Sequence, residues 1–223
     1  FMTFDAGHSR YNVGYNPATN SVNGIAGVKM GLFDQTLTIA PFIEMGYAVN
    51  KVTDRYESTN QYYGAGVTTK YDIYKGIYAT GAFRIGRSKT DFSSFDLTDV
   101  DGERAEYKTD STYTGAEIGA GWIHQITENM SIDLYGMYYY SYISENTAEV
   151  LEDPLEFTRV NSHRLNLGIK VDRKLTSKLE MYCKASFERE FAGEINARTY
   201  GYQIEPLVLK GNIFGAEVGL KGK

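Results

Sequence analysis

Residues 161–192, NSHRLNLGIKVDRKLTSKLEMYCKASFEREFA, separate two chemical faces residue by residue. From Leu179 to Phe191 the odd positions are apolar apart from one arginine, and the even positions are polar or charged. The segment from Arg164 to Asp172 alternates in the same way. A period of two is typical of extended strands whose two faces meet different surroundings. The polar segment 173–178 between them predicts a hairpin, whose oily face meets either a protein core or lipid.

The composition favours strands over helices. The 223 residues include 19 Tyr and 23 Gly but only four Pro and one Trp. This balance is typical of strands joined by tight bends. A chain of this length is usually one domain when it is all β, so we expect a single domain over residues 1–223.

Charge and cysteine content exclude several classes of function. A net charge of -5 and a pI near 5.3 argue against a nucleic-acid partner, because no basic stripe is present to bind phosphates. A single cysteine excludes an internal disulfide and a cysteine-based metal cluster. No apolar run approaches the roughly 20 residues of a spanning helix. A mean hydropathy of -0.37 is still compatible with a membrane, since the strands of a transmembrane barrel average out to polar.

Ten strands are predicted along the chain, and the segments between them alternate in length. Long polar loops, such as residues 50–60 and the acidic 88–110, alternate with short turns. In an up-and-down sheet this puts every short turn at one end, as in outer-membrane barrels. Strands of about ten residues match a tilted membrane crossing. The strands are expected near residues 2–11, 22–32, 36–49, 61–71, 77–87, 111–124, 131–143, 206–220, and in the two halves of 161–192.

Aromatic residues on the oily faces lie near both ends of the predicted strands. Two belts of this kind place amphipathic rings at headgroup depth, although aromatics are also common in ordinary strands. Those near the long loops are Tyr47, Tyr142 and Phe191, and those near the short turns are Phe33, Tyr71 and Trp122.

Five segments resemble the C-terminal translocator β-domain of bacterial autotransporters. The resemblance implies an outer-membrane β-barrel that anchors and exports its own N-terminal passenger, with its long loops outside the cell. It also implies the outer-membrane lipid and the barrel assembly machinery as partners, a monomeric barrel, and no enzymatic activity or cofactor. The segments are YYGAGVTTKYDIYKGIYATGAFRIGR (62–87), DLYGMYYYSY (133–142), VNSHRLNLGIKV (160–171), YCKASFEREFAGEINA (182–197) and LKGNIFGAEVGL (209–220).

The sequence departs from the family's pattern at its ends. The family's barrels have twelve strands and end in an aromatic residue, whereas this sequence ends in Gly222-Lys223. We therefore expect a fragment of about ten strands, truncated at the C-terminus and without passenger or signal peptide. Such a sheet has unpaired outer strands that favour aggregation.

If the oily face meets lipid, the polar face lines a lumen. Charges of both signs and small residues such as Gly64, Gly66, Gly119 and Gly121 suggest a wet passage with room for an extended polypeptide. The alternative is that these charges are only a solvated lining. The predicted pore-lining residues are Glu44, Lys70, Asp72, Arg84, Glu117, Asp133, Arg164, Lys170, Asp172, Lys184, Glu188 and Glu190.

No catalytic or metal site is predicted. Glu188 and Glu190 share a face, as paired acid/base carboxylates do, but Lys184 lies there too and a lumen wall accounts for all three. Ser162 and His163 are adjacent and point to opposite faces, which excludes a direct dyad.

Three further features have ordinary explanations. The three histidines, His8, His124 and His163, have no metal-ligand spacing. Cys183 is on the oily face, as expected of a small hydrophobe. The acidic stretch around Gly102 does not match a calcium-binding loop, because Leu97 and Lys108 fall at its first and last ligand positions.

Two other classes of function stay open. One is an outer-membrane barrel that acts as an enzyme or a porin. An enzyme would need Asp/His or Ser/His pairs in the long loops, which contain no histidine. The other is a soluble β-sandwich that binds a ligand, in which the polar faces would not carry charges in every strand.

Overall fold

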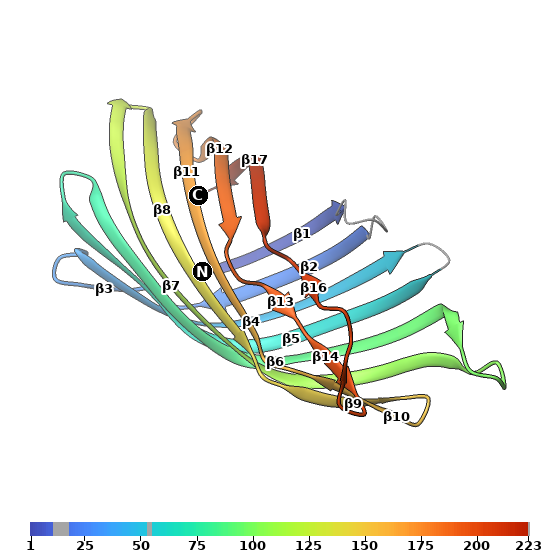
Figure 1. Cartoon of the computed structure of the whole chain (residues 1–223). Coiled ribbons are helices and arrows are strands. Elements are labelled where there is room, and N and C mark those ends of the chain that lie inside the picture. The colour runs from blue at the N-terminus through green and yellow to red at the C-terminus, as the bar shows by residue number, and fades with distance from the viewer. Residues whose placement is uncertain (11–17, 53–54, 223) are drawn as a thin grey trace.

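The protein consists of β-strands, of which ten long ones form a single antiparallel sheet (Figure 1). The computed structural model describes residues 1–10, 18–52 and 55–222. Each long strand pairs with the next along the chain, which confirms the predicted up-and-down arrangement. In sheet order they are β1 (Met2–Arg10), β2 (Ala18–Gly27), β4 (Leu37–Val52), β5 (Tyr56–Tyr74), β6 (Ile77–Thr98), β7 (Arg104–Thr127), β8 (Met130–Ile143), β11 (Val160–Lys174), β12 (Leu179–Glu190) and β17 (Gly211–Gly222).

The sheet curls into a trough, and its two outer strands, β1 and β17, each pair with one neighbour in the described part of the chain (Figure 1). Alternation along the strands gives it a concave and an outward face. In β4, Ala40, Phe42 and Glu44 are buried, while Ile43 and Met45 between and beside them are 57% and 59% exposed. Side chains converge on the concave face and diverge on the outward face. Within the described residues there is no helix long and apolar enough to cross a membrane.

The second predicted strand is interrupted near Val28. The structure has β2 up to Gly27 and a short β3 (Met30–Leu32), both paired with β4. Pro41 of β4 lies opposite the break and accepts a hydrogen bond from the Val28 N–H at 3.1 Å. Because proline has no N–H to return, the ladder is broken here.

Two of the predicted loops are largely strand. The prediction of a long loop at 88–110 is wrong, because β6 continues to Thr98 and β7 begins at Arg104. The loop predicted at 50–60 is likewise shortened, with β4 reaching Val52 and β5 starting at Tyr56. In these extensions polar residues lie on both faces, so the two-faced pattern that identified the strands disappears although the ladder of hydrogen bonds continues.

The connections after β8 and after β12 build a second, smaller sheet at the same end (Figure 1). The segment after β8 forms the hairpin β9 (Asn146–Val150) and β10 (Asp153–Phe157). The segment after β12 contributes β14 (Ala197–Thr199) and β15 (Tyr202–Gln203), giving the order β15-β14-β10-β9. It also contains β13 (Glu194–Ile195) and β16 (Leu207–Val208), which pair with each other.

Aromatic contacts connect this small sheet to the main one. The Phe157 ring of β10 lies 5.4 Å from the Tyr107 ring of β7, which stacks on Phe92 at 4.8 Å, and Phe92 contacts Tyr56 at 5.5 Å. The Tyr107 side chain is consequently removed from water, which raises the pKa of its hydroxyl. The long-connection end of the molecule thus has a small apolar core of its own.

Candidate functional site

The concave face carries all twelve residues that the sequence analysis assigned to a lumen. Strand parity and register place each of them on this side of the sheet. They gather into two ionic networks and several smaller pairs. The face is therefore polar but internally compensated.

The first network, here called the Glu44 network, consists of Glu44, Arg84, Tyr113 and Glu117. The Tyr113 hydroxyl donates to Glu44 Oε1 at 2.7 Å. Arg84 donates from Nη1 to Glu44 at 3.3 Å and from Nη2 to Glu117 at 3.4 Å. The Glu44 side chain is only 2% exposed, so its charge depends on these partners.

Curvature and glycine together allow the contact between Glu44 and Tyr113. Their strands, β4 and β7, are separated by β5 and β6, which corresponds to roughly 14 Å across a flat sheet. Gly64 and Gly86 lie between them, and a Cβ at either position would meet the Tyr113 side chain. The tyrosine thus crosses two strands because both intervening positions lack a side chain.

Large side chains lying over glycines recur along the concave face. Phe42 lies over Gly66, Met137 over Gly119, and Tyr78 over Gly121, where a Cβ would collide with each. The expectation that these glycines leave an open passage is therefore wrong in detail. The space above them is filled by neighbouring side chains, which pack against the backbone of the sheet.

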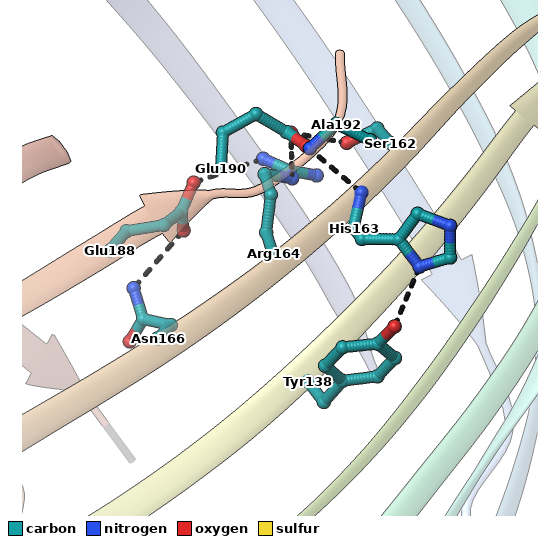
Figure 2. A network of polar contacts seen from close by, with 8 residues as sticks. All are labelled: Tyr138, Ser162, His163, Arg164, Asn166, Glu188, Glu190 and Ala192. Carbon is teal, nitrogen blue, oxygen red and sulfur yellow. Dashed lines mark hydrogen bonds and ion pairs between the residues drawn. The ribbon is translucent and has the colours of Figure 1, made fainter. Parts of the chain in front are cut away.

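The second network, here called the Glu190 network, joins β11 and β12 (Figure 2). Glu190 accepts hydrogen bonds from the Ser162 hydroxyl at 2.5 Å and from the backbone N–H groups of His163 and Ala192 at 2.9 and 3.0 Å. Arg164 lies between the two carboxylates of this face. Its Nη1 is 3.2 Å from Glu188 and its Nε 3.8 Å from Glu190.

Glu190 belongs to the last register pair of β11 and β12, beyond which the Phe191 and Gly193 N–H groups still donate to the His163 and Asn161 carbonyls, each at 2.9 Å. The Glu190 carboxylate takes the His163 N–H that a backbone carbonyl would accept in a continuing ladder. The chain then turns at Gly193, whose φ of +61° is in the left-handed region that favours glycine. From this point the segment 194–208 leaves the main sheet: its strands β14 and β15 join the small sheet, and β13 and β16 pair with each other.

The remaining predicted residues pair locally towards the short-turn end. Lys70 contacts Asp72 at 2.6 Å, and Lys170 contacts Asp172 on the same strand. Asp133 accepts from the Tyr78 hydroxyl at 3.0 Å. The last of them, Lys184, is 3.8 Å from Glu217.

Several members of this face were missed from the sequence. Glu217 of β17, and Tyr78 and Tyr113 of the wall, follow the same strand parity as the predicted charges and were identifiable by it. Tyrosine was instead considered only as a belt residue. On the concave face it serves as a long hydrogen-bond donor.

The outward face presents the predicted aromatic residues. Tyr47 and Phe191, near the long connections, are 44% and 49% exposed, and Tyr71 and Trp122, near the short turns, are 49% and 42% exposed. His163 is on this face and its Nδ1 is 2.6 Å from the Tyr138 hydroxyl, whereas Ser162 points to the concave face. Cys183 is exposed outward.

A cleft of about 550 Å³ lies at the long-connection end, between β5, β6, β7 and β9. Phe92 and Tyr107 line it together with carboxylates from Glu57, Asp91, Glu106 and Glu149, and its lining includes no histidine or cysteine. In the described part of the chain no three His, Cys, Asp or Glu side chains are grouped to hold a metal ion. Within the cleft the Ser93 hydroxyl donates to Glu106 Oε1 at 2.9 Å, a polar contact between the paired strands β6 and β7.

A family model, described as "Autotransporter beta-domain", matches residues 2–222 of the chain. No curated protein matches the sequence. The fold is similar to that of solved translocator domains, and at the identities found this likeness shows a shared fold.

Three structures illustrate the similarity. The translocator domain of the autotransporter NalP from Neisseria meningitidis is 16% identical, with a TM-score of 0.77 over 100% of this chain and 75% of that one. The β-domain of the Bordetella autotransporter BrkA is 14% identical, with a TM-score of 0.65 over 100% and 91%. The transport unit of AIDA-I from Escherichia coli is 16% identical, with a TM-score of 0.61 over 98% and 78%.

Proposed function

The chain belongs to the autotransporter β-domain family, and from this premise we propose that its concave face is the wall along which the passenger polypeptide crosses the outer membrane. The protein is an outer-membrane translocator that serves its own passenger. The twelve concave-face residues predicted from the sequence are proposed to line this route.

The pairing of charges on the concave face supports the proposal most directly. A route for a chain of varied sequence needs a wetted wall that holds neither acidic nor basic segments strongly. Arg84 is shared between two carboxylates, and so is Arg164. Charges that are already paired bind a passing charged segment weakly. The free energy gained by binding that segment would have to exceed the free energy lost when the existing ion pair breaks.

We propose that the long connections face the outside of the cell. In outer-membrane barrels the short turns are periplasmic and the longer loops extracellular. Here the turns at Phe33–Gln35 and Lys75–Gly76 are short, whereas the opposite end carries the strand extensions and the small sheet. That end is correspondingly rich in polar residues on both faces of its strands.

Translocator domains of this family are not enzymes, and we propose the same for this protein. We also propose that residues 1–223 act as a single, monomeric domain, and that the barrel assembly machinery inserts it. The continuous main sheet from β1 to β17 supports a single domain.

Charge reversal at the Glu190 network tests the role of the concave wall. In the full-length protein, Arg164→Glu and Glu188→Arg should each lower passenger display at the cell surface, and the double exchange should restore part of it by re-forming the pair. Lys178→Glu, in a turn, is the matched control. Display is divided by the amount of folded barrel, measured from heat-modifiable gel migration. Unchanged display in both single variants would leave these charges as a solvated lining only.

A further inference from the structure

The outward face of the strands from β7 to β17 is almost free of charge. Between the aromatic ends of these strands its residues are apolar, aromatic, small or neutral polar, with one exception. Arg189 of β12 is the single Asp, Glu, Lys or Arg that faces outward within the described segments 112–122, 132–142, 161–171, 181–191 and 212–220.

Arg189 lies exposed near the long-connection end of its strand. It is opposite Leu165 in the β11 register and opposite Asn212 in the β17 register. Its guanidinium carbon is 5.5 Å from the centre of the Phe191 ring, so the side chain extends towards the belt at this end. Within the described residues, no carboxylate is at ion-pair distance from it.

Two other arginines show what is unusual about this position. Arg164, on the concave side of the same hairpin, is shared between Glu188 and Glu190. Arg87 also faces outward at the long-connection end, and its Nε is 3.0 Å from Asp110. Arg189 differs from both because no carboxylate in the described part of the chain pairs with it.

An unpaired guanidinium on a lipid-facing surface needs an anionic partner at its own depth. Charged side chains near the ends of spanning segments extend to the interface, where phosphate groups of lipids lie. Arginine suits this partner because its planar group donates two parallel hydrogen bonds to a phosphate. Leu165, the register partner of Arg189, separates it from Tyr138 of β8, and His163 lies two residues before Leu165 on the same face. The His163 ring and the Tyr138 hydroxyl, joined by their 2.6 Å contact, add polar atoms near the arginine.

We propose that Arg189, with His163 and Tyr138 near it, binds the phosphate of a phosphorylated glycolipid in the outer leaflet of the membrane. The assignment to that leaflet rests on the proposed outward orientation of the long connections. The proposed lipid binding takes place on the outward face of the barrel and is separate from passage of the polypeptide along the concave face.

Binding of lipopolysaccharide to the purified full-length barrel in detergent tests this proposal. The ligands are lipopolysaccharide carrying its lipid phosphates and the same lipid after dephosphorylation. The unmodified protein should bind the phosphorylated form on the order of tenfold more tightly, as expected for one charge-assisted contact. Arg189→Gln should abolish that difference, Arg189→Lys should retain part of it, and Arg87→Gln, whose arginine is already paired, should leave it unchanged.

The lipid-binding measurement does not depend on whether the variant exports its passenger. Heat-modifiable migration establishes that each variant is folded, and passenger display is measured in parallel to keep the translocation proposal separate. Equal affinity of the unmodified protein for both lipids would overturn the proposal. So would a phosphate preference that persists in a folded Arg189→Gln barrel.

Discussion

The concave and outward faces of this sheet are built by the same alternation but are organised in opposite ways. On the concave face side chains converge, so that Tyr113 reaches Glu44 across two strands and Arg84 joins two carboxylates. On the outward face they diverge, and Ile43 and Met45 stay more than half exposed. Contacts between side chains therefore stabilise the concave face, whereas the side chains of the outward face mainly contact the surrounding lipid or solvent.

The β11–β12 hairpin shows this difference within a few residues. Arg164 on its concave side has two carboxylates, and Arg189 on its outward side has none within the described residues. The same residue type is thus satisfied by protein on one face and, in our account, by lipid on the other. Substitutions matched across the two faces test this comparison.

The largest effect is expected from a charge placed in the middle of the outward face. Leu167 is 50% exposed outward and lies midway between the ends of β11. Leu167→Lys should lower the free energy of unfolding in lipid vesicles by about 2–4 kcal/mol, because an ammonium group is poorly solvated by hydrocarbon. Its neighbour Asn166 faces Glu188 on the concave side. Asn166→Lys should cost much less, and equal losses in urea titrations would contradict the assignment of the faces.

Removal of the buried carboxylate should have the next largest effect. Glu44→Ala leaves the Tyr113 hydroxyl and one side of Arg84 without their acceptor, and should destabilise the barrel by about 2–3 kcal/mol. Glu44→Gln should cost less, since the amide oxygen still accepts from Tyr113. The outward control is Ile43→Ala, which removes a lipid-exposed side chain. A loss for Ile43→Ala as large as that for Glu44→Ala would argue against an internally organised wall.

A smaller effect is expected from adding one methyl group to the wall. At Gly121 a Cβ would collide with the Tyr78 ring, whereas at outward Gly81 the nearest atoms are 3.5 and 3.6 Å away. Gly121→Ala should therefore cost about 1–2 kcal/mol, and Gly81→Ala close to nothing. Tyr78→Ala in the Gly121→Ala background removes the collision, so the double substitution should cost less than the sum of the two single ones. Strict additivity would show that the ring does not pack on this glycine.

The smallest effect on the barrel is expected at the small sheet. Phe157→Ala removes one ring contact with Tyr107, worth about 0.5–1.5 kcal/mol, and should loosen the small sheet without unfolding the wall. Protease added to intact cells should then cut the segment 194–208 faster. Tyr202, which is 78% exposed, supplies the control Tyr202→Ala. Equal cleavage of the two variants would mean that the aromatic contacts do not hold this sheet in place.

The two faces of the sheet could be predicted from the sequence, but its curvature could not. Parity along each strand placed Glu44 and Glu188 on one side and Leu167 on the other, and the ten long strands were found from it. The contact of Glu44 with Tyr113 was not predictable, because it joins strands three places apart and depends on the curl. The extension of β6 to Thr98 was missed for a different reason: beyond the two-faced region both sides of the strand are polar, so its sequence looks like a loop.

Site-specific photo-crosslinking on β12 during export tests the central claim most directly. Ser186 faces the concave side and Ala185 the outward side, one residue apart and at the same depth. A photo-crosslinking amino acid at position 186 of the full-length protein should capture the passenger while it crosses, and the same group at position 185 should capture lipid but no passenger. Capture of the passenger at 185 and not at 186, or equally at both, would contradict the assignment of the concave face as the export route.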